Sequence, residues 1–376
     1  MKKEYYISIL SGQQRGILAT LIRSFLTVFT YPYLAVLNAR SALYKYGIRK
    51  SVRLPANVIS IGNITMGGTG KTPLVEFTAR YLLNKGKSVA ILSRGYGSNG
   101  KVHVNESKSG EDVDFKNSVV VNDEYLVLRE NLKEAPVFSG KDRVQNGEKA
   151  IREHGTDFLI LDDGFQHLRL KRDLDIVVID ALSPLAGNFL IPKGTLRGPL
   201  RDLSSAGLFV LSHCNLCDEH TLKSIYKTLH HINADVPVCE TIHKPVHIES
   251  IKDNSFLETG WLEGKRIFSL CAIGNPESFK STLRESGADI IGFKSFRDHH
   301  SFTQGELNKV IAESRSLNAD AIVVTQKDSV KIRDKNINGA NFLSLKIEIE
   351  ITKGMEFYEK AVDKIVDAYK VPKVRD

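Results

Sequence analysis

Short apolar runs recur along the first two-thirds of the chain, separated by stretches with helical spacing. The runs lie at residues 58–61, 89–92, 119–121, 158–161, 176–179 and 208–211. Runs of this length that are apolar throughout are typical of strands buried on both faces of a parallel sheet. Strands that alternate with helices favour a doubly wound, mainly parallel α/β sheet. We therefore predict an α/β domain over residues 51–244.

The same kind of pattern begins again after residue 245. We predict strands at 266–272, 321–325 and 342–351, with helices at 276–286 and 356–369. Residues 240–259 have mixed polarity and are expected to form the connection. The sequence thus predicts a second, smaller α/β domain over residues 245–376.

The first 50 residues carry a different pattern. Apolar side chains from Leu18 to Leu37 repeat at spacings of three and four, which predicts an amphipathic helix. Arg23 and Pro32 argue against a helix that spans a bilayer, and Pro32 is expected to break it. An interfacial helix on a membrane and an ordinary helix packed on the protein's own core both fit this pattern.

Charge favours the membrane alternative for this N-terminal region. The chain has a net charge of +8, and no acidic residue occurs between Glu4 and Glu76. A basic segment of this kind faces an anionic partner: phospholipid, nucleic acid or a phosphorylated substrate. No basic aromatic sheet motif or recognition helix supports nucleic acid. Four cysteines are too few for a disulfide framework, and the N-terminus lacks a signal-peptide pattern, so we expect a reducing compartment.

A glycine-rich turn follows the first apolar run. Residues 67–72 read GGTGKT and precede a stretch with helical spacing. Strand, glycine-rich turn and helix is the context of a phosphate-binding loop, in which backbone N–H groups surround phosphate oxygens. Lys71 would add positive charge, and Thr72 a hydroxyl suited to Mg²⁺. The common pattern has glycine at position 65, where this chain has Thr65.

Acidic residues follow other predicted strands. Asp162 and Asp163 end the run at 158–161, where an acid can help to hold Mg²⁺. Gln166 in the same turn could contact the metal or orient water, and His167 could be structural. Residues 122–124 (Asn-Asp-Glu) form a weaker signal of the same kind. Residues 298–300 (Asp-His-His) could form a catalytic pair or a metal site, although a surface loop is the plainer interpretation.

Two further clusters, one basic and one of cysteines and histidines, could bind a ligand or have no functional role. Lys193, Arg197 and Arg201 lie in a Pro/Gly-rich loop that could contact phosphate or simply face solvent. A second string has the spacing of metal ligands, but one CxxC pair is weak evidence for zinc. Its members are His213, Cys214, Cys217 and His220.

Taken together, these motifs resemble the tetraacyldisaccharide 4′-kinases, the lipid A 4′-kinase family of Gram-negative bacteria. The motifs that carry the resemblance are 62–73 (GNITMGGTGKTP), 93–97 (SRGYG), 162–167 (DDGFQH) with 172–173 (RD), 272–276 (AIGNP), 298–300 (DHH) and 324–328 (VTQKD). The family has the same residue type at position 65. In combination, the first motif and DDGFQH are highly specific.

The resemblance implies a kinase that uses ATP and Mg²⁺ to phosphorylate the 4′-hydroxyl of an acylated glucosamine disaccharide 1-phosphate. It implies a P-loop α/β fold with a second domain and a peripheral location on the cytoplasmic face of the inner membrane. No nucleic-acid partner is expected. Acyl-chain preference, nucleotide preference, oligomeric state and protein partners are left open.

The resemblance also assigns roles to single positions. The residues that it implies for nucleotide binding are Thr65, Met66, Gly67, Gly68, Thr69, Gly70, Lys71 and Thr72. Those implied for metal contact, directly or through water, are Thr72, Glu124, Asp162 and Gln166. Asp123 would accept the proton of the sugar hydroxyl, His299 from the second domain would support it, and Lys71 would also serve catalysis.

The chain departs from the family pattern in three places. Residues 122–125 read Asn-Asp-Glu-Tyr where the family usually has Gly-Asp-Glu-Pro, Gln326 stands where it has glutamate, and residues 193–195 read Lys-Gly-Thr rather than Ala-Gly-Pro. A membrane-associated nucleotide switch of the deviant P-loop type is the alternative function. Such ATPases usually carry a lysine just before the glycine pair, where this chain has Met66.

Overall fold

The computed structural model describes residues 16–94, 122–183, 185 and 189–368. The predicted strand at 119–121 and residues 95–97 of the SRGYG motif lie outside these ranges.

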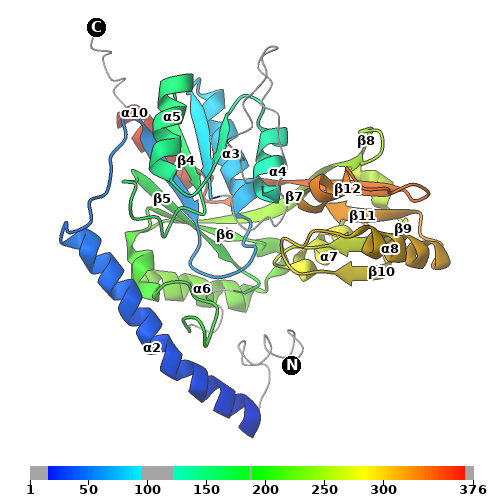
Figure 1. Cartoon of the computed structure of the whole chain (residues 1–376), viewed down its shortest axis with the longest axis horizontal. Coiled ribbons are helices and arrows are strands. Elements are labelled where there is room, and N and C mark those ends of the chain that lie inside the picture. Colours follow the sequence, from blue (N-terminus) through cyan, green and yellow to red (C-terminus); the bar gives the residue numbers. More distant parts are fainter. Residues whose placement is uncertain (1–15, 95–121, 184, 186–188, 369–376) are drawn as a thin grey trace. The chain divides into compact units, whose positions relative to one another are not determined.

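Helices and strands alternate along most of the described chain (Figure 1). The α-helices are α2 (Ile17–Lys45), α3 (Lys71–Asn84), α4 (Asp123–Asn131), α5 (Arg143–His154), α6 (Glu219–Ile232), α7 (Pro276–Glu285), α8 (Gln304–Ser316), α9 (Gln326–Ile332) and α10 (Met355–Ala368). The strands are β1 (Asn57–Gly62), β2 (Val89–Ser93), β3 (Val137–Ser139), β4 (Phe158–Asp162), β5 (Leu174–Asp180), β6 (Leu208–Ser212), β7 (Val238–Ser250), β8 (Phe256–Leu257), β9 (Arg266–Cys271), β10 (Asp289–Ser295), β11 (Ala321–Thr325) and β12 (Phe342–Lys353).

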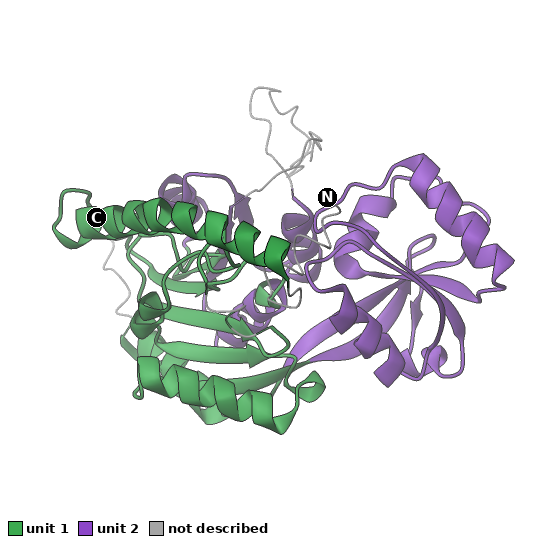
Figure 2. Ribbon diagram, turned by 90° about the horizontal axis from the view of Figure 1, so that it is seen from below, with its two compact units in different colours: residues 1–71, 156–242, 351–376 green, residues 72–155, 243–350 purple. Residues whose placement is uncertain are grey.

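The chain divides into two compact units, each made of separate segments (Figure 2). Unit 1 comprises residues 1–71, 156–242 and 351–376, and unit 2 comprises 72–155 and 243–350. The continuous division predicted at residues 50 and 244 stays a prediction, because compactness and function need not divide a chain at the same places.

Unit 1 is built on parallel strands. β1 pairs with β4 on one side and with β5 on the other, and β5 pairs in turn with β6. The register places Ile61 beside Asp162, and Asp180 beside Ser212. Because parallel strands end at the same edge, the polar residues that follow β1, β4, β5 and β6 gather there.

Unit 2 contains the parallel strands β10, β9, β11 and β12 in that order, and the parallel pair β2 and β3. Two apolar cores lie in this unit. One includes Phe268, Phe302 and Phe342, and the other includes Leu262, Phe279 and Leu345. The predicted class, a mainly parallel α/β fold with a phosphate-binding loop and an apolar N-terminal helix, is confirmed.

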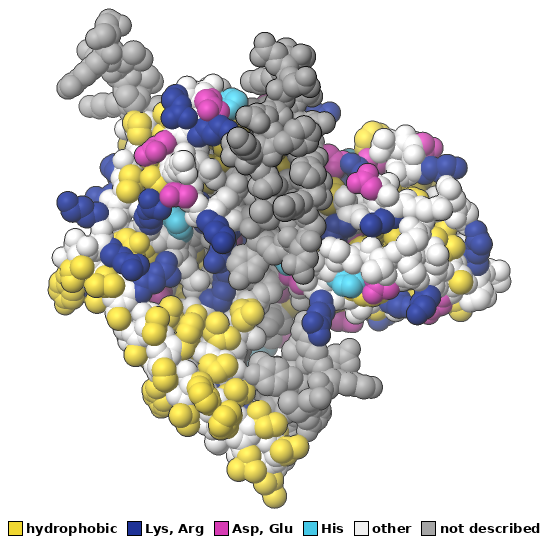
Figure 3. Space-filling model, viewed as in Figure 1, with side chains coloured by type: hydrophobic (Ala, Val, Ile, Leu, Met, Phe, Trp, Pro, Cys, Tyr) yellow, Lys and Arg dark blue, Asp and Glu magenta, His cyan; other side chains and the backbone are white. Residues whose placement is uncertain are grey.

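Helix α2 packs on unit 1 through only part of its length. Tyr33, Leu34 and Leu37 contact an apolar core of that unit. Large apolar side chains elsewhere on the helix are exposed, and Figure 3 shows them gathered along it: Ile17, Leu18, Leu21, Phe25, Val28, Phe29, Tyr31 and Val36. By length and composition alone, α2 could cross a bilayer, although one such helix is weak evidence.

Two expectations about local structure are wrong. α2 continues through Pro32, whose position is exposed, so water can satisfy the carbonyl group that proline leaves without an N–H partner. The predicted connection at 240–259 contains β7 over residues 238–250. Many of its side chains are only half-buried or exposed, which explains the mixed polarity of this segment.

Candidate active site

The glycine-rich loop of unit 1 lies between β1 and α3. Gly67 has φ of +114° and Gly70 has φ of +80°, conformations that residues with a Cβ rarely adopt. Inside the loop, Asn63 Nδ2 donates to Thr69 Oγ1 at 3.1 Å. Ser212, at the end of β6, donates its hydroxyl to the carbonyl oxygen of Thr69 at 3.0 Å. Buried polar side chains of the loop itself and of β6 therefore hold the loop in place.

A second segment, residues 195–197, pairs with the first half of this loop. Met66 N donates to the carbonyl oxygen of Thr195 at 2.8 Å, and Arg197 N to that of Ile64 at 2.7 Å. Tyr33 of α2 donates its hydroxyl to the carbonyl oxygen of Arg197 at 2.9 Å. The basic loop predicted around Arg197 is thus part of the wall of the phosphate-binding loop.

The turn after β4 carries acidic side chains, one of which pairs with both Arg197 and Lys71. Asp162, the last residue of β4, is almost fully buried. Asp163 accepts two hydrogen bonds from the guanidinium of Arg197, at 2.7 and 2.9 Å. Lys71 Nζ lies 3.7 Å from the same carboxylate. Arg197 and Lys71 therefore share one carboxylate beside the loop.

Close packing explains the glycine in this acidic turn. A Cβ on Gly164 would lie 2.7 Å from Ser60 Oγ of β1, so a side chain does not fit. Two residues further on, the carbonyl oxygen of Gln166 accepts a hydrogen bond of 2.8 Å from Arg40 of α2. The turn is thus held both by a strand and by the N-terminal helix.

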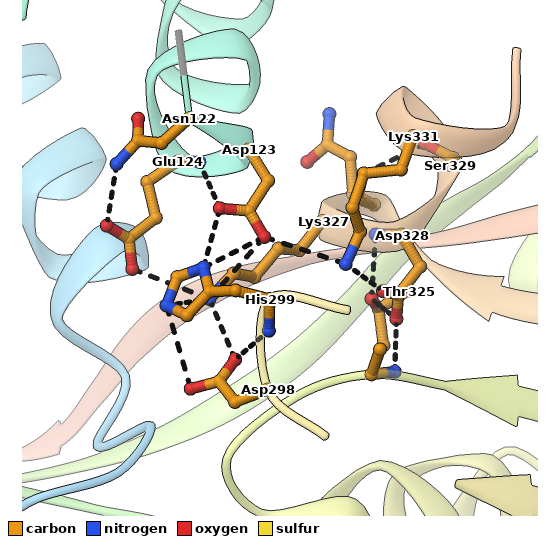
Figure 4. Close-up of polar contacts among 12 residues, drawn as sticks. Asn122, Asp123, Glu124, Asp298, His299, Thr325, Lys327, Asp328, Ser329 and Lys331 are labelled. Carbon is orange, nitrogen blue, oxygen red and sulfur yellow. Dashed lines mark hydrogen bonds and ion pairs between the residues drawn. The ribbon is translucent and has the colours of Figure 1, made fainter. Parts of the chain in front are cut away.

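The candidate catalytic pair lies in unit 2, at the N-terminus of α4 (Figure 4). Asn122 caps this helix by accepting a hydrogen bond from Tyr125 N at 2.8 Å. Asp123 is buried, and its two carboxylate oxygens lie 2.8 and 3.1 Å from Nδ1 of His299. Because a carboxylate only accepts, Nδ1 carries the hydrogen. His299 has φ of +59°, and its ring faces Asp123.

Opposing effects set the charge state of this pair. Burial alone would raise the pKa of the Asp123 carboxyl, but the hydrogen bond from His299 and the charges of Lys327 and Lys331 outweigh it and lower the pKa to about 2. The hydrogen bond to Asp123 raises the pKa of the His299 imidazole. Asp123 is therefore ionised at neutral pH, and Nδ1 of His299 stays protonated.

Lys327 of α9 joins the groups around this pair. Its ammonium nitrogen lies 3.2 Å from Asp298 Oδ1, 3.4 Å from Glu124 Oε1 and 3.5 Å from Nε2 of His299 (Figure 4). Burial would lower the pKa of Lys327, but Glu124 and the neighbouring aspartates outweigh it and raise the pKa. Lys327 is thus a charged centre that links α4, α9 and residues 298–299.

The two adjacent histidines differ in their surroundings. His300 stacks on Phe296 with ring centroids 4.7 Å apart, and its Nε2 lies 3.0 Å from Glu306 Oε2. His299 instead contacts Asp123. The residue type alone gives both positions the same chemistry. The family resemblance implied a role for His299, and the fold brings this histidine to Asp123.

The Cys/His string at 213–220 does not form a cluster. His213 Nδ1 lies 2.9 Å from Asp180 Oδ1, and Cys214 donates its thiol to the carbonyl oxygen of Leu211. Burial raises the pKa of the Cys214 thiol to about 12, whereas a metal ligand must be a thiolate. Within the ranges that the structure describes, no group of three or more His, Cys, Asp or Glu residues is arranged to hold a metal ion.

The predicted site residues fall into two sets. Unit 1 holds the loop residues Thr65 to Lys71 together with Asp162 and Gln166, and unit 2 holds Thr72, Asp123, Glu124 and His299. Lys327 and Lys331 were not assigned roles from sequence. Their signal was present, because two lysines four residues apart directly after a predicted strand share one face of a helix.

Comparison with known proteins gives a consistent result. A model of the tetraacyldisaccharide-1-P 4′-kinase family, LpxK, matches residues 22–367. The tetraacyldisaccharide 4′-kinase of Syntrophus aciditrophicus is 36% identical over 88% of this chain and 90% of its own length. The enzyme of the same name from Halothermothrix orenii is 33% identical, over 93% and 94%.

A solved structure agrees with these matches. The crystal structure of LpxK from Aquifex aeolicus in complex with ATP superposes with a TM-score of 0.66 at 27% identity, over 92% of this chain and 99% of that one. The family-model match over residues 22–367 spans the positions of the glycine-rich loop, the acidic turn, Asp123 and His299. The chain belongs to the tetraacyldisaccharide-1-P 4′-kinase family.

Proposed function

We propose that this protein transfers the γ-phosphate of ATP to the 4′-hydroxyl of a tetraacylated glucosamine disaccharide 1-phosphate, a step in lipid A biosynthesis. The match over residues 22–367 carries this proposal, since it spans every motif discussed above. Phosphoryl transfer depends mainly on positioning and on neutralising charge. The roles of single residues follow from that requirement.

In this proposal, residues 65–72 bind the phosphates of the nucleotide. The positive φ angles of Gly67 and Gly70 support a curled backbone, and the loop leads directly into α3, whose N-terminus favours an anion. Lys71 is held near Asp163 and would move its ammonium group to the phosphates. The A. aeolicus protein, which binds ATP, supports ATP as the nucleotide.

Asp123 is our candidate for accepting the proton of the sugar hydroxyl, with His299 as its support. A carboxyl with a pKa of about 2 is a weak base, but it is ionised at neutral pH and so able to align the hydroxyl. In a loose transition state the hydroxyl proton leaves late, so alignment matters more than base strength. His299 would hold the carboxylate through its protonated Nδ1.

We propose Mg²⁺ as the metal ion, because all four candidate ligands carry oxygen donors. Thr72, Glu124, Asp162 and Gln166 offer hydroxyl, carboxylate and amide oxygens, the hard ligands that this ion prefers, and few are needed because it keeps several waters. When bound, Mg²⁺ would neutralise phosphate charge.

We propose that α2 lies on the anionic cytoplasmic face of the inner membrane, where an acylated substrate resides. The exposed apolar side chains of α2 and the absence of acidic residues between Glu4 and Glu76 support this placement. The full helix is also long enough to insert more deeply.

Two substitutions test the proposed division of roles. Lys71→Ala should weaken ATP binding, and Asp123→Asn should keep ATP binding but lower kcat by about 100-fold or more, the scale of a lost acid–base group. Equilibrium binding of labelled ATP and turnover with the acylated disaccharide measure the two effects. Asp334→Asn, at an exposed position, is the matched control. Turnover like that of the wild type in Asp123→Asn would remove Asp123 from its proposed role.

A further inference from the structure

Helix α9 places two lysines beside Asp123. Lys327 and Lys331 are four residues apart and therefore lie on the same face of the helix. Lys331 Nζ lies 3.6 Å from Asp123 Oδ2, and its side chain is largely buried. In Figure 4 the ammonium group of Lys331 lies between the carboxylates of Asp123 and Asp328. The family's mechanism as set out above gives Lys331 no role.

Asp328 is a fixed anchor for this lysine. It is fully buried, and its Oδ2 accepts hydrogen bonds from Ala272 N at 2.9 Å and from Thr325 Oγ1 at 2.7 Å. Its Oδ1 lies 2.6 Å from Lys331 Nζ. Ala272 directly follows β9, and Thr325 ends β11. The carboxylate is thus tied to the ends of two strands and has little freedom to move.

A chain of contacts therefore leads from the sheet of unit 2 to the candidate base. Asp328 fixes the ammonium group of Lys331, and that ammonium group faces Oδ2 of Asp123. On its other side, Asp123 meets Nδ1 of His299. A carboxylate held from two sides cannot rotate freely about its Cβ–Cγ bond.

We propose that Lys331, anchored by Asp328, is a positioning residue that fixes the orientation of the Asp123 carboxylate for phosphoryl transfer. This inference rests on the proposed function, in which Asp123 receives the hydroxyl proton. Displacement of a reacting group by about 1 Å can cost about 100-fold in rate, so a positioning residue has a measurable effect.

Lys331 is a cleaner probe of this effect than Lys327. Lys327 also contacts Glu124 and Asp298, so its loss would disturb a proposed metal ligand. Lys331 meets Asp123 and Asp328, and it lies over the ring of Phe302 at 5.4 Å. Substitution of Lys331 therefore acts on the Asp123 carboxylate without touching Glu124.

The test measures kcat and the KM values for ATP and for the acylated disaccharide in the full-length protein. We expect Lys331→Met to lower kcat by about 10- to 100-fold and to change the KM for ATP by less than about twofold. Lys335→Met, at an exposed position just beyond the end of α9, is the matched control. Lys331→Arg keeps the charge and should recover part of the loss.

Lys331→Met leaves Asp328 buried without its ion pair and could fail to fold for that reason. The double variant Asp328→Asn/Lys331→Met removes both charges together, and we expect the same loss of kcat with a melting temperature closer to that of the wild type. Wild-type kcat in this folded double variant would overturn the proposal.

A double-mutant cycle with Asp123→Asn separates positioning from a general structural role. If Lys331 acts through Asp123, Lys331→Met should cause no further loss in the Asp123→Asn background. If the losses in kcat of the two single variants instead multiply in the double variant, the inference is overturned and the proposed function stays intact. A wild-type rate in Asp123→Asn alone would instead contradict the proposed role of Asp123, and the inference would fall with it.

Discussion

At the scale of single residues, the clearest result is the environment of Asp123. A carboxylate in a buried position would normally hold its proton, but a histidine and two lysines keep this one ionised. The same fold gives the adjacent His300 an unrelated structural contact with Glu306. Chemistry at this site is therefore decided by which side chains the tertiary fold brings to Asp123.

The Asp123–His299 pair predicts a pH dependence of stability. Because folding raises the pKa of His299, protonation of this imidazole stabilises the folded state. This stabilisation is complete below the pKa of the unfolded state, near 6.5, and is lost as the pH rises through the pKa of the folded state. Because folding lowers the pKa of Asp123, ionisation of this carboxyl also stabilises the folded state. This stabilisation is present above the pKa of the unfolded state, about 3.9, and is lost as the pH falls toward about 2. The pair should stabilise the protein most at mildly acidic pH.

We therefore expect His299→Gln to lower the melting temperature by a few degrees at about pH 5 and by less at about pH 9. Thermal melts of both proteins at the two pH values measure this difference. His231→Gln, at an exposed position of α6, should show no such dependence. An equal effect of His299→Gln at both pH values would mean that the pair does not contribute through its charges.

At the scale of elements, the apolar runs predicted strands well where both faces are buried. β1, β2, β4, β5 and β6 all cover the predicted runs. β7 and β10 were missed, because many of their side chains are only partly buried and their residues lack a continuous apolar pattern. Pro32 shows the same limit: whether a proline breaks a helix depends on whether its surroundings can satisfy the freed carbonyl group.

Helix α2 leads to a prediction about membrane binding. Leu21 and Phe25 are one turn apart and more than half exposed. Replacing both with glutamine removes apolar area without adding charge, and we expect binding to anionic phospholipid vesicles to weaken by at least about tenfold. Vesicle sedimentation measures this change. Ser24→Gln, at an exposed polar position of the same helix, is the control.

Vesicle binding should also weaken as salt is raised, since part of the attraction is electrostatic. Unchanged binding of the Leu21→Gln/Phe25→Gln variant would favour the alternative in which α2 serves only to pack on unit 1. In that case the hydrogen bonds of Tyr33 to Arg197 and of Arg40 to Gln166 would be its main role.

At the scale of the whole molecule, sequence predicted the fold class and the family, because the specific motifs extend from residue 62 to residue 328. It could not predict that each compact unit is assembled from separate segments, since compactness depends on contacts between distant parts of the chain. For the same reason it did not assign roles to Lys327, Lys331 and Asp328, whose importance appears only when α9 is placed beside α4. The Asp123–His299 pair was expected only through the family resemblance.

The central claim is that this protein phosphorylates an acylated glucosamine disaccharide at its 4′-position. Mass spectrometry of a tetraacylated disaccharide 1-phosphate incubated with the protein, ATP and Mg²⁺ tests it most directly. We expect the lipid to gain one phosphate, with fragmentation placing it on the distal glucosamine. Formation of ADP with an unchanged lipid, or a phosphate on any other group, would contradict the account.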